Sequence, residues 1–229
     1  MSDPNWKDQL IGYLETEDRE HAHKAALDAL ETGKTDIRTL YEDVLAPALN
    51  RISGEEEKEA ETIWREHVMT AIVRGIVESA YPYVIRERNA RGASPGSKVL
   101  IFCPAGETHE LGARMAADFF LIWGHQAIFI GADTPEKTLL DAIERTRPDW
   151  LCLSVSNDFN LFGAKRLVSD LRARFGPDTR IFAGGRAIAK TPTAYADIGA
   201  DGAVNGFDDI GRMTGDSAGN TGRKGGVDV

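Results

Sequence analysis

The sequence is poor in cysteine and has no disulfide framework. Only two cysteines occur among its 229 residues, Cys103 and Cys152, and both lie in apolar, strand-like runs. This placement is typical of reduced core residues, and the sequence therefore predicts a cytoplasmic protein. A disulfide or a metal-binding pair is the less favoured alternative.

Long apolar runs and basic clusters are also missing. No apolar run approaches the roughly 20 residues that cross a bilayer, so no membrane segment is predicted. The first residues, MSDPNWKDQL, show no basic segment followed by an apolar stretch, which argues against a secretory signal. The net charge is −9, and no stretch of the chain is strongly basic, so direct binding to nucleic acid is disfavoured. Any effect on transcription would have to pass through a partner protein.

Residues 1–91 carry apolar residues at the three- and four-residue spacing of amphipathic helices. Pro47 is expected to kink or restart its helix. The sequence predicts a four-helix bundle, and residues 92–97, rich in glycine, serine and proline, are expected to form a linker. The four predicted helices cover residues 5–15, 18–32, 35–52 and 55–88.

After the linker, short β-rich runs alternate with amphipathic helices. This alternation predicts an α/β domain over residues 98–212, with a flavodoxin-like, doubly wound, five-stranded parallel sheet. The tail, residues 213–229, is rich in glycine and polar residues and is expected to be disordered. The predicted strands are 98–103, 126–130, 150–155, 179–183 and 202–205, and the predicted helices are 110–123, 135–146, 160–175 and 191–198.

Three polar or glycine-containing segments follow three of these strands, where a parallel sheet binds its ligands. Taken singly, each has an ordinary interpretation: a surface histidine, a serine that ends its strand, and a glycine turn. Their joint placement on one edge of the sheet favours a binding site. The residues are Glu107, His109 and Gly112 after the first strand, Ser154 and Ser156 at the third, and Gly184 and Gly185 after the fourth.

The spacing Glu107-x-His109-x-x-Gly112 resembles the Asp-x-His-x-x-Gly signature of the cobalamin-binding domains of methionine synthase, corrinoid methyltransfer proteins and cobalamin-dependent mutases. The resemblance covers essentially residues 8–210, because these domains follow a four-helix cap. It implies that His109 coordinates cobalt from below in place of the dimethylbenzimidazole base, and that Glu107 accepts a hydrogen bond from the other imidazole nitrogen.

The resemblance also assigns the remaining residues on this edge. Gly112 would let the nucleotide tail pass close to the start of a helix. Ser154 matches the serine that contacts the displaced base, with Ser156 beside it. Gly184 and Gly185 match the glycines that leave room for the tail, because a side chain there would occupy that space.

Two departures from the common pattern resemble the light-responsive, cobalamin-binding repressors. Glu107 stands in place of the aspartate, and Glu66-His67 matches the Glu-His pair of the helical cap. The alternative interpretation of Glu66-His67 is a polar pair at the rim of an amphipathic helix. The tryptophan that precedes this pair in the photoreceptors is replaced by Glu56, which would open the space above the corrin. Trp64, on the same predicted helix, is expected to pack in the core.

These features leave three functions to compare. The favoured one is a sensory module that binds adenosylcobalamin, responds to light through cap rearrangement or a change of oligomer, and acts through a partner protein. It resembles the photocobilins in having room for a bilin such as biliverdin as a second chromophore. The alternative is a corrinoid protein that shuttles methyl groups between methyltransferases. An FMN or phosphate site is rejected because the acidic residues Glu107 and Glu110 would repel phosphate, and the absence of a nucleophile–base pair argues against an enzyme.

Overall fold

The computed structural model describes residues 5–53 and 60–218. The chain divides into two compact units, residues 1–91 and 92–229. Among the described residues no single helix is long and apolar enough to cross a membrane. One bent pair, Ile63–Ser79 with Tyr81–Arg91, meets that criterion of length and composition when its two helices are taken together.

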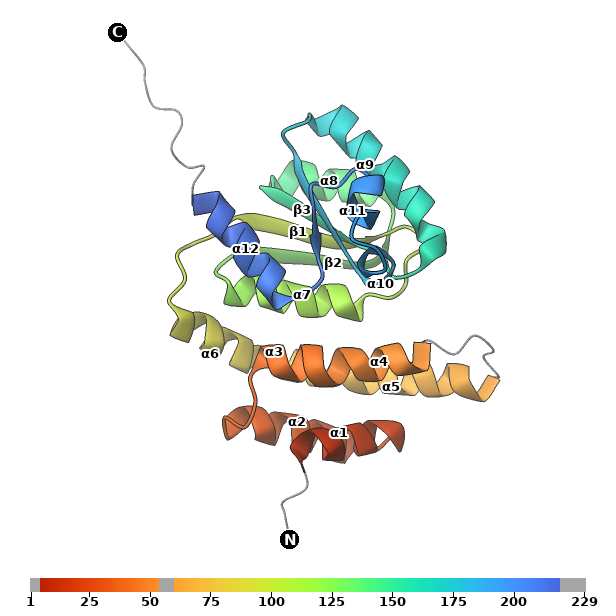
Figure 1. Ribbon diagram of the computed structural model, residues 1–229, viewed down its shortest axis with the longest axis vertical. Coiled ribbons are helices and arrows are strands. Elements are labelled where there is room, and N and C mark those ends of the chain that lie inside the picture. Colours follow the sequence, from red (N-terminus) through yellow and green to blue (C-terminus); the bar gives the residue numbers. More distant parts are fainter. Residues whose placement is uncertain (1–4, 54–59, 219–229) are drawn as a thin grey trace. The chain divides into compact units, whose positions relative to one another are not determined.

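The first unit is entirely helical in its described part (Figure 1). Short polar side chains mark where several of its helices begin: Asp18 accepts a hydrogen bond from the backbone N–H of His21, and Asp36 from that of Thr39. Leu10 and Leu14 are fully buried, as apolar residues four apart on one helix face should be. The elements are α1 (Trp6–Glu15), α2 (Arg19–Glu31), α3 (Ile37–Thr39), the π-helix η1 (Leu40–Leu45), α4 (Ala46–Ser53), α5 (Ala60–Ser79) and α6 (Tyr81–Arg91).

Prolines explain the two irregularities in this unit. The expected disturbance at Pro47 is confirmed, because the chain winds as a π-helix over Leu40–Leu45 and resumes the α-helix immediately before the proline. The single helix predicted over residues 55–88 is wrong: α5 ends at Ser79, and α6 continues from Tyr81 at an angle of 44°. Pro82 explains the break, since it lacks an N–H group and its ring crowds the preceding helical turn.

The second unit is a five-stranded parallel sheet with the strand order β2-β1-β3-β4-β5, which confirms the predicted flavodoxin-like fold (Figure 1). Its strands are β1 (Lys98–Pro104), β2 (Gln126–Thr134), β3 (Trp150–Ser154), β4 (Arg180–Gly184) and β5 (Gly202–Val204). Its helices are α7 (Leu111–Ile122), α8 (Glu136–Thr146), the short 3₁₀-helix η2 (Asp158–Asn160), α9 (Leu161–Phe175), α10 (Arg186–Ala189), α11 (Ala194–Asp197) and α12 (Phe207–Ala218).

Helices cover both faces of this sheet. Figure 1 shows α8 and α9 on one side and α7 on the other. The apolar core joins Leu100, Leu151 and Ile181 of the central strands to Leu139 of α8 and Val168 of α9, all buried. Because these strands are covered on both faces, they consist of nearly continuous apolar residues rather than an alternating pattern.

The expectation of disorder from residue 213 is wrong for its first part, because α12 runs on to Ala218. The oxygen of Thr214 lies 2.9 Å from Nε2 of the buried His125, just before β2, and donates to the carbonyl of Ile210. Near the start of the helix, the ring of Phe207 packs against the ring of Trp123 in a tilted arrangement, with the ring centroids 5.2 Å apart. These contacts fix the helix although its sequence is rich in glycine and polar residues.

Candidate functional site

The site lies at the carboxyl ends of β1 and β3. These strands are neighbours in the sheet, and the chain leaves β1 towards β2 on one side and β3 towards β4 on the other. Such a reversal of strand order opens a crevice where α/β sheets bind ligands. Two segments meet there, the 105–110 loop after β1 and residues 155–160 after β3.

Glu107 joins these two segments. Its side chain is fully buried, and both carboxylate oxygens accept hydrogen bonds. Oε1 accepts from the backbone N–H of His109 at 3.0 Å and lies 2.9 Å from Nδ1 of the same residue. Oε2 accepts from the backbone N–H groups of Ser156 and Asn157, each at 2.9 Å, and from the side-chain amide of Asn160 at 3.1 Å.

This arrangement keeps the buried carboxyl group ionised. Burial by itself would raise the pKa of Glu107, but the hydrogen bonds from His109, Asn157 and Asn160 outweigh it and hold the pKa at about 2, against an ordinary value of 4.5. At neutral pH the group is therefore a fixed negative charge beside the imidazole.

His109 is oriented by this charge. Its side chain is 45% exposed, and because the ionised Glu107 can only accept, the hydrogen between the two residues belongs to Nδ1. The neutral imidazole then carries its lone pair on Nε2, the nitrogen on the other side of the ring from Glu107. The thiol of Cys103 donates to the carbonyl of His109 at 3.8 Å, and burial raises the pKa of this thiol to about 12, so it keeps its proton.

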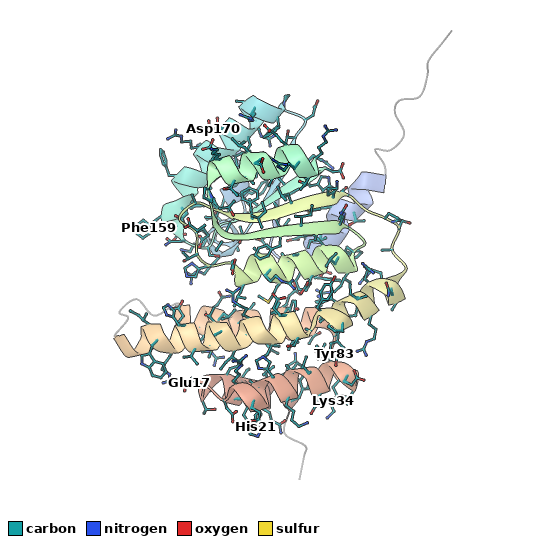
Figure 2. The ribbon with its side chains drawn as sticks, turned by 180° about the vertical axis from the view of Figure 1, so that it is seen from behind. Glu17, His21, Lys34, Tyr83, Phe159 and Asp170 are labelled. Carbon is teal, nitrogen blue, oxygen red and sulfur yellow. The ribbon has the colours of Figure 1, made fainter. Side chains whose placement is uncertain are left out.

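The site contains two residues that the sequence did not point to, Asn157 and Asn160. Asn160 donates to Glu107 and also to the carbonyl of Gly106 at 3.2 Å. The oxygen of Asn157 accepts from the N–H of Phe159, which forms the turn that brings both asparagines to the carboxylate. Phe159 itself is 92% exposed and projects from this turn (Figure 2). No sequence pattern marks these residues, because a hydrogen bond made across two loops has no fixed spacing.

The two serines lie where they were predicted, at the end of β3. Ser154 is buried and pairs in register with Gly184 of the neighbouring strand. Ser156 contributes its backbone N–H to Glu107, so the structure connects it to the site through the main chain.

The glycines differ in what surrounds them. A Cβ atom at Gly112 would meet no atom within 4 Å apart from its chain neighbours and the backbone of its own helix. At Gly184 it would lie 2.4 Å from the carbonyl oxygen of Val204, and at Gly185, whose φ is +97°, 2.5 Å from that of Val155. The packing of the protein's own backbone therefore requires Gly184 and Gly185, and their role in leaving room for a nucleotide tail stays a prediction.

The cap residues lie on α5 or outside the described part of the chain. Glu66 is half-buried and His67 is exposed. Trp64 is 49% exposed, which contradicts the expectation that it packs in the core. Glu56 lies outside the described residues.

Comparisons with known proteins concern the domain that contains these residues. A family model described as the B12-binding domain matches residues 97–211, half of the chain. The HTH-type transcriptional repressor CarA of Myxococcus xanthus is 32% identical over 91 residues, which are 39% of this chain and only 29% of the repressor. The monomethylamine corrinoid protein of Methanosarcina barkeri superimposes with a TM-score of 0.71 over 89% of this chain and 94% of that protein. At 15% identity, the similarity to the corrinoid protein shows only that the two chains share a fold.

Proposed function

The chain belongs to the family of B12-binding domains, and on that premise we propose that it is a cobalamin-binding sensory module that responds to light. The observation that carries the cobalamin part is the pair formed by His109 and the buried, ionised Glu107. The light response is the further step, and it rests on the resemblance of Glu107 and the Glu66-His67 pair to the light-responsive repressors; a transcriptional repressor is also among the similar proteins.

The residues of the site fit a cobalt ligand. A metal-binding histidine usually donates its other ring N–H to a carboxylate, which sets the tautomer and raises the basicity of the ligating nitrogen. His109 has this partner already in place, and its side chain is exposed enough to meet a large ligand. The open space beside Gly112, at the start of α7, suits a nucleotide tail passing close to the helix.

The sensory proposal concerns the upper ligand. Alkylated cobalamin supplies a cobalt–carbon bond that light can break, and we propose adenosylcobalamin as the form bound. Glu107, found where methyltransferases have aspartate, and the Glu66-His67 pair support a sensor. The exposed His67 is proposed to contact the upper ligand, together with Glu66. Glu56, in place of the capping tryptophan, is proposed to make room for a bilin such as biliverdin.

The output is proposed to pass through a homo-oligomer or a partner protein rather than through DNA. The excess of acidic residues disfavours contact with nucleic acid. No catalytic role is proposed for the chain itself, since the residues gathered at the site act as a ligand and its supports. A cytoplasmic location also stays a prediction; both cysteines are buried and free.

The test is to reconstitute the purified protein with adenosylcobalamin, with and without biliverdin, and to record absorption spectra before and after illumination. A lasting light-driven change of the cobalamin spectrum is expected, and an additional red-absorbing band would establish the bilin. His109→Ala should return the bound cobalamin towards the base-off spectrum. Binding of methylcobalamin with no lasting response to light would instead favour the methyl shuttle, and an unchanged spectrum in His109→Ala would refute the assignment of the lower ligand.

A further inference from the structure

The end of β2 holds the 105–110 loop from the side opposite to residues 155–160. The carboxylate of Asp133 accepts a hydrogen bond from the backbone N–H of Gly106 at 2.7 Å. The backbone N–H of Asp133 donates to the carbonyl of Glu107 at 2.8 Å. One residue thus fixes both ends of the short segment that leads to the buried carboxylate.

A second bond ties the same two segments together. The carboxylate of Glu110, at the start of α7, accepts from the backbone N–H of Ala132 at 2.7 Å. The 105–110 loop is therefore attached to β2 on both sides of His109 in the sequence.

The backbone of β2 is shaped for this attachment. Its register against β1 shifts twice near its end, where Phe102 pairs with Gly131 and Pro104 with Thr134. Such bulges redirect residues at the ends of strands. Asp133 has a φ of 45°, a left-handed conformation that aspartate tolerates better than most residues but that still costs free energy. Strain of this kind persists only where the surrounding structure enforces it.

We infer that Asp133 is a positioning residue for the lower ligand: by holding Gly106 and Glu107 it sets where the Glu107 carboxylate meets His109. This inference rests on the proposed function, because it concerns the same ligand pair. It adds a strand, β2, that the sequence pattern left out of the site. It also implies that the pair is held in place before cobalamin binds.

The chain offers a matched control at the opposite end of β1. Asp149 makes the same reciprocal pair of bonds to Lys98, the first residue of that strand: its N–H donates to the carbonyl of Lys98 at 2.8 Å, and its carboxylate accepts from the Lys98 N–H at 2.7 Å. Replacing either aspartate by glycine removes its carboxylate, and with it one of the two bonds, but only Asp133 lies next to the ligand pair.

The experiment compares Asp133→Gly, Asp133→Asn and Asp149→Gly. Glycine accepts the positive φ and deletes only the carboxylate, whereas asparagine keeps an acceptor oxygen at the same place. Two sets of measurements are needed. The first, on the cobalamin-bound protein, is the affinity for cobalamin and the His-on absorption spectrum. The second, on the cofactor-free protein, is hydrogen exchange of the Gly106 amide and the NMR signal of the His109 Nδ1 proton.

Asp133→Gly is expected to lower cobalamin affinity on the order of 10-fold, as the loss of other supports of metal-bound histidines does, and to shift the spectrum towards the base-off form. It should also speed exchange at Gly106 and broaden the His109 proton signal. Asp133→Asn should largely retain the wild-type behaviour, and Asp149→Gly should change neither readout.

If Asp133→Gly fails to fold, Glu110→Ala removes the second attachment without altering Asp133 and is expected to act in the same direction. Equal effects of Asp133→Gly and Asp149→Gly on both readouts would overturn the inference. Failure of the wild-type protein to bind cobalamin would instead refute the proposed function. The measurements on the cofactor-free protein would still decide whether Asp133 positions the pair.

Discussion

Replacing Glu107 by glutamine should destabilise the protein far more than the removal of one charge on the surface. Both oxygens of Glu107 accept hydrogen bonds, from His109 on one side and from Ser156, Asn157 and Asn160 on the other. An amide group has one acceptor oxygen and one NH₂ donor, so in either orientation the NH₂ faces other donors. A buried donor that has no acceptor lowers the free energy of unfolding by about 1–3 kcal/mol.

The pKa of Glu107 gives an independent magnitude. A shift from 4.5 to about 2 is worth about 3 kcal/mol of stability at neutral pH, at 1.36 kcal/mol for each pKa unit. Because the pKa is lower in the folded than in the unfolded protein, this contribution is complete above pH 4.5 and is lost as the pH falls towards 2. The protonated carboxyl group then resembles the glutamine.

The measurement is urea-induced unfolding of the wild-type protein and Glu107→Gln at a series of pH values, followed by tryptophan fluorescence. The difference between the two should be about 3 kcal/mol at pH 7 and should shrink below pH 4.5. Glu136→Gln, which changes an exposed carboxylate in the first turn of α8, is the control and should cost less than about 1 kcal/mol. A difference that stays constant down to pH 2 would refute the argument from charge.

Three further outcomes follow from residues outside this network. His125 is buried, which lowers its pKa, so stability should decline as the pH falls below about 6.5, and His125→Phe should flatten this dependence in unfolding experiments between pH 7 and 5. Gly185→Ala should lower the unfolding free energy by about 2 kcal/mol or more, because a Cβ there meets the Val155 backbone at a φ of +97°. Gly112→Ala, with open space around its Cβ, should preserve or slightly raise stability but weaken cobalamin binding in a titration if the tail passes this helix. Unchanged affinity in the Gly112→Ala variant would place the tail elsewhere.

Much of the fold could be predicted because the spacing of apolar residues along the sequence indicates which positions are buried. The alternation of apolar runs and amphipathic helices indicated the parallel sheet, and the five predicted strands correspond to β1–β5. The wrong predictions concern the end of α5 and the extent of α12. Pro82 ends α5 within a pattern that otherwise continues, and α12 persists in a polar, glycine-rich segment because His125 and Trp123 provide its partners.

The candidate site was predictable only in part. The spacing of Glu107, His109 and Gly112 pointed to the pair of Glu107 and His109, which the structure shows in hydrogen-bond contact. These residues belong to one loop and the start of its helix, so their spacing is visible in the sequence. Asn160 and Asp133 come from segments far along the chain, after β3 and at the end of β2, so the sequence gives no sign that they meet this loop. The same limit applies to Gly184 and Gly185, because the contacts that require a bare backbone there come from Val204 and Val155.

The position of the negative charge, beside the imidazole of His109, explains why several hydrogen-bond donors converge on the carboxylate of Glu107. A buried Glu107 with fewer donors would take up a proton, and a protonated carboxyl group could donate to Nδ1 of His109 and leave the opposite tautomer. Nε2 would then carry the hydrogen and could not bind a metal. The donors on residues 156–160 therefore act on the ligand indirectly, by keeping Glu107 an acceptor. All of them belong to the sheet unit, so the proposed lower ligand and the described residues that hold it lie within that unit.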